Sequence, residues 1–406
     1  MKKNLIPIYF LSFVNTIGFS ILFPVLPTII REFSDSEFVY GIVLSTYPLF
    51  QFVATPVLGE LSDSLGRRPV LIISQFGTLL SWFIFLFAFA VKDLYFYGLS
   101  VGLIVIIFSR IVDGITGGNV SVANAYVTDV VPQEDRSRIF ANLGLIFGLG
   151  FIIGPSLGGL SASFSIGAIG TVVLSIIVST FTLLCIIFLL PESLINRDDD
   201  LNIKKSIMSI NIFKKFKEIK EKFIYQIFLI RLFFSLTFAG FTPLLVLFLE
   251  DKFNMKPRDL GFVFFILGLF IFVNQGIVSK KISKKFGEYK TFLSGVLITI
   301  SSIFLFSFIN SLILFYILMF LISLGNALFF PNFKTLLANN SDSKKLGLVN
   351  GLDESILALS NVISPIISTL IYSIYKFNSF WIYTVCLLML AALSLWVLEK
   401  RYIPNN

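Results

Sequence analysis

The chain has 406 residues, of which 56% are apolar and only 14% are charged, whereas soluble globular proteins are about 45 to 50% apolar and about 25% charged. This composition excludes an ordinary soluble enzyme. The apolar residues fall into runs of about 20, each long enough to cross the hydrocarbon core of a bilayer as a helix. We therefore predict an all-α polytopic membrane protein.

Several kinds of chemistry lack the residues they need. The chain has no histidine, and its two cysteines, Cys185 and Cys386, lie in separate apolar segments, so we expect neither a metal site nor a disulfide scaffold. No GxxxxGK loop is present, which argues against direct use of ATP. The net charge of +8 comes from loops between apolar segments, which does not indicate a nucleic-acid partner. We expect no enzymatic activity and no cofactor.

Hydropathy predicts twelve membrane helices, joined by short loops with one exception. They cover residues 5–30, 39–60, 69–91, 94–128, 138–162, 165–191, 224–250, 259–280, 290–309, 311–333, 346–373 and 378–398. If the N-terminus is cytoplasmic, 24 of the 32 Lys and Arg residues lie in cytoplasmic loops and tails. By the positive-inside rule we expect both termini in the cytoplasm and a location in the inner (plasma) membrane.

The one long connection divides the predicted helices six and six. We expect an N-terminal bundle at 1–191, a cytoplasmic linker at 192–223 and a C-terminal bundle at 224–406. Within the linker, Ile212, Phe216, Ile219 and Phe223 recur at helical spacing among lysines. That spacing favours a helix on an anionic membrane surface, with a plain flexible linker as the alternative.

A charged motif follows the second predicted helix. Its key residues are Gly59, Asp63, Gly66, Arg67 and Arg68, which place an acid and two arginines at the cytoplasmic interface. Asp63 can pair with Arg67 or cap a neighbouring helix end; the alternative is a generic basic loop. The ordered spacing resembles the cytoplasmic signature of the major facilitator superfamily.

Further segments resemble one branch of that superfamily, the drug:proton antiporters of group 1. They are Gly18–Pro27 in the first predicted helix, Arg110–Asn119 in the fourth and Gly150–Gly159 in the fifth. The resemblance implies two pseudo-symmetric six-helix bundles, with a central cavity lined by the first, fourth, seventh and tenth helices. It also implies that Asp129 joins Asp63 and Arg67 in a cytoplasmic gating network.

The fifth predicted helix carries a row of small residues. Gly150, Gly154 and Gly158 recur at every fourth position, which gives one smooth face for close backbone approach. Pro155 removes a backbone donor beside them, and Gly159 follows. The resemblance implies that this segment seals the contact between the halves.

The fourth predicted helix carries the main polar candidates, Arg110, Asp113, Gly117, Ser121 and Asn124, at spacings that place them on one inward face. Arg110 and Asp113 can form an i, i+3 pair. Either the pair is permanent and structural, or Asp113 exchanges its arginine partner for a proton during transport. Both alternatives remain open at this stage.

Two positions depart from tetracycline exporters, which carry membrane carboxylates in the first and third helices. The matching positions here are Asn15 and Ser81. A drug–metal chelate site is therefore not expected, and tetracycline itself is not predicted as the substrate.

Other residues are weaker candidates for the cavity. Asp353 and Glu354 could bind a cation or proton, or could equally balance Lys344 and Lys345 at the cytoplasmic mouth. Glu250 and Asp251 are expected to be solvated. The many phenylalanines are consistent with a composition bias, but inward-facing ones would suit an aromatic or cationic substrate. Those candidates are Phe19, Phe23, Phe234 and Phe238.

These observations predict a proton-coupled secondary transporter that exports small amphipathic drugs or metabolites by alternating access. One alternative is an uncoupled or importing facilitator for a metabolite, and another is a transport-inactive receptor or scaffold. The expected partners are a small-molecule substrate, protons and membrane lipids, with no nucleic acid. We expect a monomer.

Overall fold

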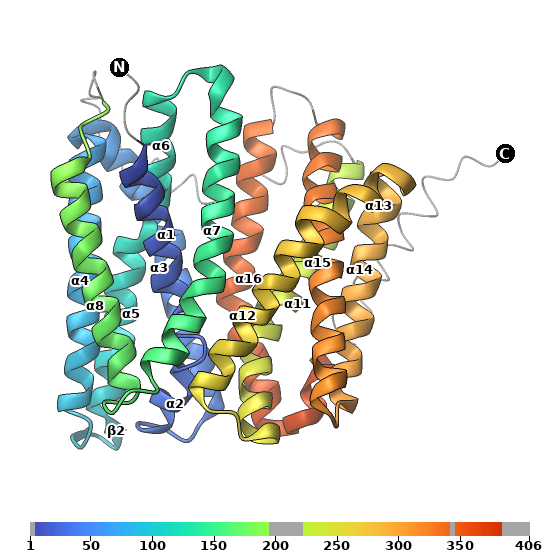
Figure 1. Ribbon diagram of the computed structural model, residues 1–406. Helices are drawn as coiled ribbons and strands as arrows, with labels where there is room; N and C mark the ends of the chain where they lie inside the picture. The colour runs from blue at the N-terminus through green and yellow to red at the C-terminus, as the bar shows by residue number, and fades with distance from the viewer. Residues whose placement is uncertain (1–4, 195–221, 342–345, 384–406) are drawn as a thin grey trace. The chain divides into compact units, whose positions relative to one another are not determined.

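The computed structural model describes residues 5–194, 222–341 and 346–383, and most of these residues are helical (Figure 1). Within this part of the chain, ten helices are long and apolar enough to cross a membrane, judged by length and composition. The prediction of an all-α polytopic membrane protein is therefore confirmed. The sequence motif of the predicted linker helix lies outside the described residues except for Phe223.

Contacts divide the chain into two units. The described part of unit 1 is 5–194 together with 249–265, and that of unit 2 is 222–248, 266–341 and 346–383. The predicted boundary at 192–223 stays a prediction, because most of that segment is outside the described residues.

Unit 1 contains most of the helices of the first half of the chain. They are α1 (Ile6–Ser20), α2 (Leu26–Arg31), α3 (Glu37–Leu65), α4 (Arg67–Ala90), α5 (Val101–Thr116), the 3-10 turn η1 (Gly117–Asn119), α6 (Val120–Val130), α7 (Gln133–Ser161) and α8 (Ala168–Leu189). In Figure 1 the start of α1 and the α6–α7 connection lie at the upper end, whereas α2 lies at the lower end.

The structure corrects the course of the first predicted helix and the start of the fourth. The first is interrupted at residues 21–25, where Pro24 has no backbone N–H to continue the hydrogen-bond ladder. The fourth begins at Val101 rather than at 94, because β1 (Tyr95–Phe96) and β2 (Leu99–Ser100) form an antiparallel hairpin there. Gly98, with φ +79°, supplies a turn conformation that most residues avoid.

The remaining helices follow the linker. They are α11 (Lys222–Phe253), α12 (Pro257–Val273), the π-helical turn η2 (Asn274–Val278), α13 (Ser279–Phe286), α14 (Glu288–Leu305), η3 (Phe306–Phe308), α15 (Leu312–Asn340), α16 (Leu346–Tyr375) and η5 (Lys376–Asn378). The corner between α11 and α12 belongs to unit 1, and the rest belongs to unit 2. The predicted twelfth helix lies largely outside the described residues.

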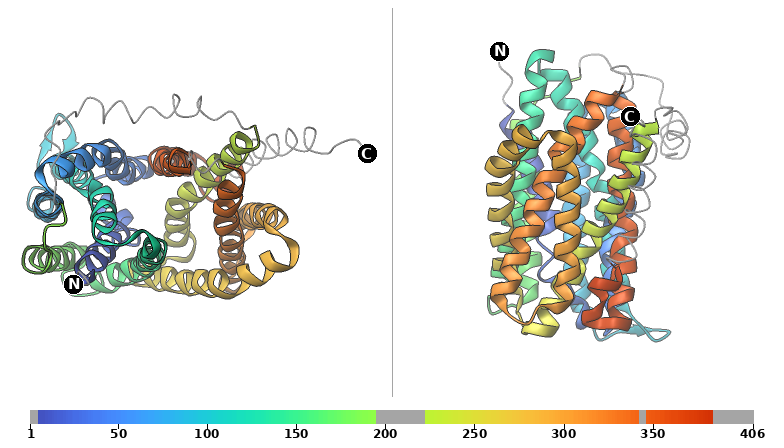
Figure 2. Two further views of the ribbon diagram at one scale, coloured as in Figure 1. Left: turned by 90° about the horizontal axis from the view of Figure 1, so that it is seen from above. Right: turned by 90° about the vertical axis from the view of Figure 1, so that its right-hand side faces the viewer.

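Each unit has its own apolar core. In unit 1 the core joins α1, α4, α6 and α8 around the fully buried Tyr126. In unit 2, α14 and α15 lie side by side (Figure 2), and Gly295 and Gly325 allow their backbones to approach closely. Phenylalanine rings stack beside them, with the rings of Phe234 and Phe329 centred 3.7 Å apart.

Candidate functional site

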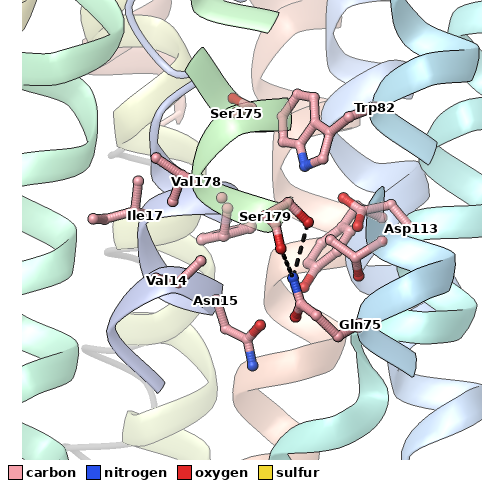
Figure 3. Close-up of a pocket in the computed structure, with 14 residues that line it drawn as sticks. Val14, Asn15, Ile17, Gln75, Trp82, Asp113, Ser175, Val178 and Ser179 are labelled. Atoms are coloured by element: carbon pink, nitrogen blue, oxygen red, sulfur yellow. Dashed lines mark hydrogen bonds between the residues drawn. The ribbon is translucent and has the colours of Figure 1, made fainter. Parts of the chain in front are cut away.

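A small cavity lies inside unit 1, between α1, α3, α4, α5, η1 and α8 (Figure 3). Its volume is ≈ 20 Å³, which is enough for about one water molecule. The wall combines aromatic and polar side chains. It consists of Val14, Asn15, Ile17, Gly18, Phe19, Tyr47, Gln75, Thr78, Trp82, Asp113, Gly117, Ser175, Val178 and Ser179.

Asp113 and Arg110 form a buried ion pair beside this cavity. Arg110 Nη2 lies 3.2 Å from Asp113 Oδ2, and both side chains are 5% exposed. The guanidinium also lies over the rings of Trp82 and Phe85, 4.8 and 5.4 Å from their centroids. The carboxylate and the rings offset part of the cost of burying the arginine charge in a membrane, while Arg110 Nε and Nη2 make no hydrogen bond to any described residue.

The fourth predicted helix, which carries the polar candidates, is not continuous. The 3-10 turn η1 interrupts the helix, and its freed carbonyls are satisfied by neighbouring helices. Gln51 Nε2 donates to the carbonyl of Gly117 over 2.9 Å, and Ser74 Oγ donates to the carbonyl of Thr116. Beyond the turn, Ser121 donates to the backbone of Thr55 and Asn124 is exposed. That all five residues share one inward face stays a prediction.

The remaining polar wall comes from α1, α4 and α8. Asn15 Nδ2 donates to Asn119 Oδ1 over 2.8 Å. Gln75 is fully buried, and its Nε2 donates to the hydroxyl of Ser179 over 2.8 Å and to the carbonyl of Ser179 over 3.3 Å. Gln75 was not among the candidates predicted from the sequence. An uncharged amide inside an apolar run is a signal that could have found it.

A second charged cluster joins the ends of α3, α4 and α6. Arg67 Nη1 lies 2.5 Å from Asp63 Oδ1, and Arg67 Nε lies 3.0 Å from Asp129 Oδ2. Ser193 also donates to Asp129 Oδ2. The three charged residues that the motif predicted are thus brought together, with the Arg67 side chain 8% exposed.

Glu192 completes this cluster and was missed from the sequence. Its carboxylate accepts from the backbone N–H groups of Arg67 and Arg68 at the start of α4, at 3.0 and 3.1 Å. It therefore caps the positive end of the helix dipole. Gly66 has φ +105°, and a Cβ there would lie 2.6 Å from Glu192 Oε2, so this turn requires glycine.

The other two motif residues have simpler surroundings. Arg68 Nη2 donates to the carbonyl of Ile187 in α8 over 2.6 Å. Gly59 faces α6, where a Cβ on it would lie 3.7 Å from Ser121 Oγ. That separation is an ordinary van der Waals contact, so Gly59 is not a tight packing position.

The glycine row of α7 packs against α1 in the same unit. Added Cβ atoms on Gly150, Gly154 and Gly158 would meet Thr16, Ser20 and the Ile21 carbonyl, respectively. Gly159 faces the start of α12, where its α-carbon would lie 3.1 Å from a Cβ on Gly261, and the Pro155 carbonyl would lie 2.9 Å from that Cβ. The predicted smooth face is present, and three of its glycines serve packing within unit 1.

Asp353 lies in a buried charged cluster in unit 2. Its Oδ1 is 2.5 Å from Arg231 Nε, and its Oδ2 is 2.5 Å from Lys334 Nζ. Glu354 points elsewhere, with its side chain 71% exposed and 3.9 Å from Lys334. The two acids that the sequence treated together therefore have different surroundings. Lys344 and Lys345 lie outside the described residues.

Glu250 is not solvated, contrary to the sequence-based expectation. Its side chain is 6% exposed, and its Oε2 lies 3.4 Å from Arg31 Nη1. Thr28 donates to Glu250 Oε1, and Arg31 Nη2 lies 2.9 Å from Asp251 Oδ1. Burial lowers the pKa of Arg31, whereas its contacts with Glu250 and Asp251 raise it. Together the two carboxylates outweigh burial, so the pKa of Arg31 lies above its ordinary value.

Of the four aromatic candidates, Phe19 is the one that lines the cavity of unit 1. Its ring contacts those of Phe23 and Tyr47. Phe234 belongs to the core of unit 2, and Phe23 is 8% exposed. Phe238 is partly buried. Among the described residues, no group of three or more Cys, Asp or Glu side chains could hold a metal ion.

Comparison with known proteins points to one family. The family model of the Major Facilitator Superfamily matches residues 8–289 and 227–405. The tetracycline resistance protein, class B, of Escherichia coli is 28% identical over 373 residues, covering 89% of this chain and 87% of the relative. The quinolone resistance protein NorA of Staphylococcus aureus is 24% identical over 388 residues, covering 92% and 91%.

A solved structure supports the same fold. A bacterial homolog of the human lysosomal transporter Spinster, in an inward-facing and unoccupied conformation, matches with a TM-score of 0.76. The match covers 99% of this chain and 98% of the other, at 15% sequence identity. Identity at this level supports the fold alone.

Proposed function

Since this chain belongs to the major facilitator superfamily, we propose that it exports small amphipathic molecules in exchange for protons by alternating access. The resemblance predicted from its motifs is confirmed at the level of the superfamily. Relatives over most of its length are named for resistance to tetracycline and to quinolones, which supports efflux of drug-like compounds.

The observation that carries proton coupling is the position of Asp113. It is a carboxylate with 5% exposure in the middle of an apolar helix, at the wall of a polar cavity and beside a single arginine. A buried acid of this kind is costly to maintain in a membrane and marks a functional site. In the proposed cycle, a proton from outside neutralises Asp113, Arg110 is released from it, and substrate leaves the cell.

The charged cluster around Arg67 supports a gating role at the cytoplasmic end. It ties the α3–α4 turn to the end of α6 by two ion pairs. We place both termini in the cytoplasm and the protein in the inner membrane as a monomer in contact with lipid. In this orientation, Arg31, Glu250 and Asp251 lie at the outer end.

The test is proton movement in energised inside-out vesicles with a panel of cationic drugs, tetracyclines and sugars. Substrate-triggered proton release by the wild type, absent in Asp113→Asn, supports antiport with Asp113 on the proton path. Asp35→Asn, which alters an exposed carboxylate of unit 1, is the matched control and keeps the response.

The close Arg110–Asp113 contact also suits a second function, an uncoupled facilitator in which the pair is permanent. Its flux would continue after the proton gradient is collapsed and would not depend on Asp113 ionisation. Gradient-independent flux of any panel compound overturns antiport and favours the facilitator. Binding without flux of any compound, in correctly inserted protein, favours a receptor.

A further inference from the structure

Gln75 is a buried amide that lines the cavity of unit 1. The side chain is fully buried, and its Oε1 atom has no hydrogen-bond partner. A buried acceptor in this state is unfavourable, and native proteins normally supply it with a donor. The unmatched acceptor therefore indicates a ligand that can donate a hydrogen bond.

The orientation of the amide is fixed by its neighbour on α8. Gln75 Nε2 lies 3.3 Å from the carbonyl oxygen of Ser179, and a carbonyl can only accept. The nitrogen must therefore face Ser179, as Figure 3 shows, and Oε1 forms the free end. An inverted amide would place two acceptors together.

The cavity limits what the donor can be. A volume of ≈ 20 Å³ is enough for about one water molecule. Asp113 lines the same cavity, and the hydroxyls of Thr78 and Ser81 lie beside its carboxylate. The other charged or titratable groups near Asp113 are Arg110 on its own helix and Tyr47 on α3.

We propose that this cavity is a binding site for a single water molecule held between the Asp113 carboxyl group and Gln75 Oε1, with Gln75 as a positioning residue for the proton. This inference rests on the proposed proton coupling and deepens it. The site needs no second carboxylate, which fits the presence of Asn15 and Ser81 where tetracycline exporters have acids.

One water satisfies both protonation states of Asp113. When the carboxylate is ionised, the water donates one hydrogen to it and the other to Gln75 Oε1. When Asp113 takes up a proton, its carboxyl group donates to the water oxygen, and the water still donates to Gln75. Gln75 Oε1 therefore keeps a donor in both protonation states.

Infrared difference spectroscopy of the full chain in lipid tests this site directly. Spectra are recorded across a pH titration in ordinary water and in water labelled with oxygen-18. We expect a carboxyl band that Asp113→Asn removes, accompanied by a water O–H band that shifts with the label. Replacing Gln75 by Leu should remove the water band and shift the carboxyl band.

Two further variants separate positioning from general damage. Gln226→Leu removes a buried glutamine of unit 2 whose Oε1 is likewise unpartnered, and it should leave both bands unchanged. If Gln75→Leu does not fold, Gln75→Met is used instead, because methionine keeps the length of the side chain but lacks the amide oxygen. It should give the same loss of the water band.

The outcomes are decisive in both directions. A wild type without a label-sensitive water band overturns the water site, and a band that survives Gln75→Leu overturns the role of Gln75. Vesicles that show no substrate-driven proton release, together with an intact water band, would reject the proposed antiport while leaving the site standing.

Discussion

Arg231 and Asp353 lie 122 residues apart in the chain, yet Arg231 Nε donates to Asp353 Oδ1 over 2.5 Å within unit 2. The guanidinium also lies over Phe330 and Phe333, 4.8 and 5.3 Å from their centroids. Arg110 in unit 1 has the same kind of support, a carboxylate and two aromatic rings. Arg110 and Arg231 are thus buried by the same physical means.

Replacing Asp353 by Asn should destabilise unit 2 strongly. Two cations, Arg231 and Lys334, lose their shared carboxylate, and removing one partner of a buried pair costs about 3–5 kcal/mol. A clearly lower melting temperature in detergent is expected, measured beside Glu354→Gln, whose exposed side chain should change little. Equal effects of the two substitutions would contradict a structural role for Asp353.

The capping role of Glu192 predicts a smaller loss. Glu192→Ala removes the acceptor for the backbone N–H groups of Arg67 and Arg68, and loss of a helix cap costs about 0.5–2 kcal/mol. Thermal unfolding of the purified protein measures the change. Glu134→Ala, an exposed acid in the first turn of α7, is the control, and an equal effect there would reject the cap.

The close contact of α7 with α1 predicts that glycine substitutions will differ along one helix. Gly158→Ala would place a methyl group against the Ile21 carbonyl, so the helices must separate, whereas a Cβ on Gly148 meets nothing within 4 Å. We expect overpacking of about 1–3 kcal/mol for Gly158→Ala. Gly148→Ala should be neutral or stabilising, because alanine favours helix over glycine. Both are compared by melting temperature and by transport rate.

The Arg31–Glu250 pair predicts weak coupling. Glu250 is 6% exposed but Arg31 is 44% exposed, so solvent reaches the arginine side of the pair, and exposed pairs contribute about 0–1 kcal/mol. A double-mutant cycle with Arg31→Gln and Glu250→Gln should give an interaction energy in this range. A much larger energy would show that the pair is shielded from solvent.

The pH dependence of this coupling follows from the sign of the arginine shift. The pKa of Arg31 is raised by Glu250 and Asp251 against the effect of burial, so the stability it contributes is fully present below its unfolded pKa. Arg31 therefore stays charged throughout the neutral and acidic range. Any loss of coupling at low pH comes from protonation of the carboxylates, and a loss confined to alkaline pH would contradict this assignment.

Local sequence signals predicted the charged motif well. Asp63 lies near the end of α3 and Arg67 begins α4, and the turn at Gly66 between them brings their side chains together. The i, i+3 spacing within α5 predicted the contact of Arg110 with Asp113. It did not predict the 3-10 turn at Gly117–Asn119 between α5 and α6. That turn persists because Gln51 and Ser74, from other helices, satisfy its carbonyls.

The sequence by itself determined the membrane class, most of the helices and the family, because hydrophobic runs and short motifs are local properties of the chain. Only the tertiary structure decided which helices supply the partners of buried polar groups. Glu192, Gln75 and Arg231 each meet residues more than 100 positions away. A buried charge or amide must find a partner, but its sequence neighbourhood does not say which one, since that choice follows from how the helices pack.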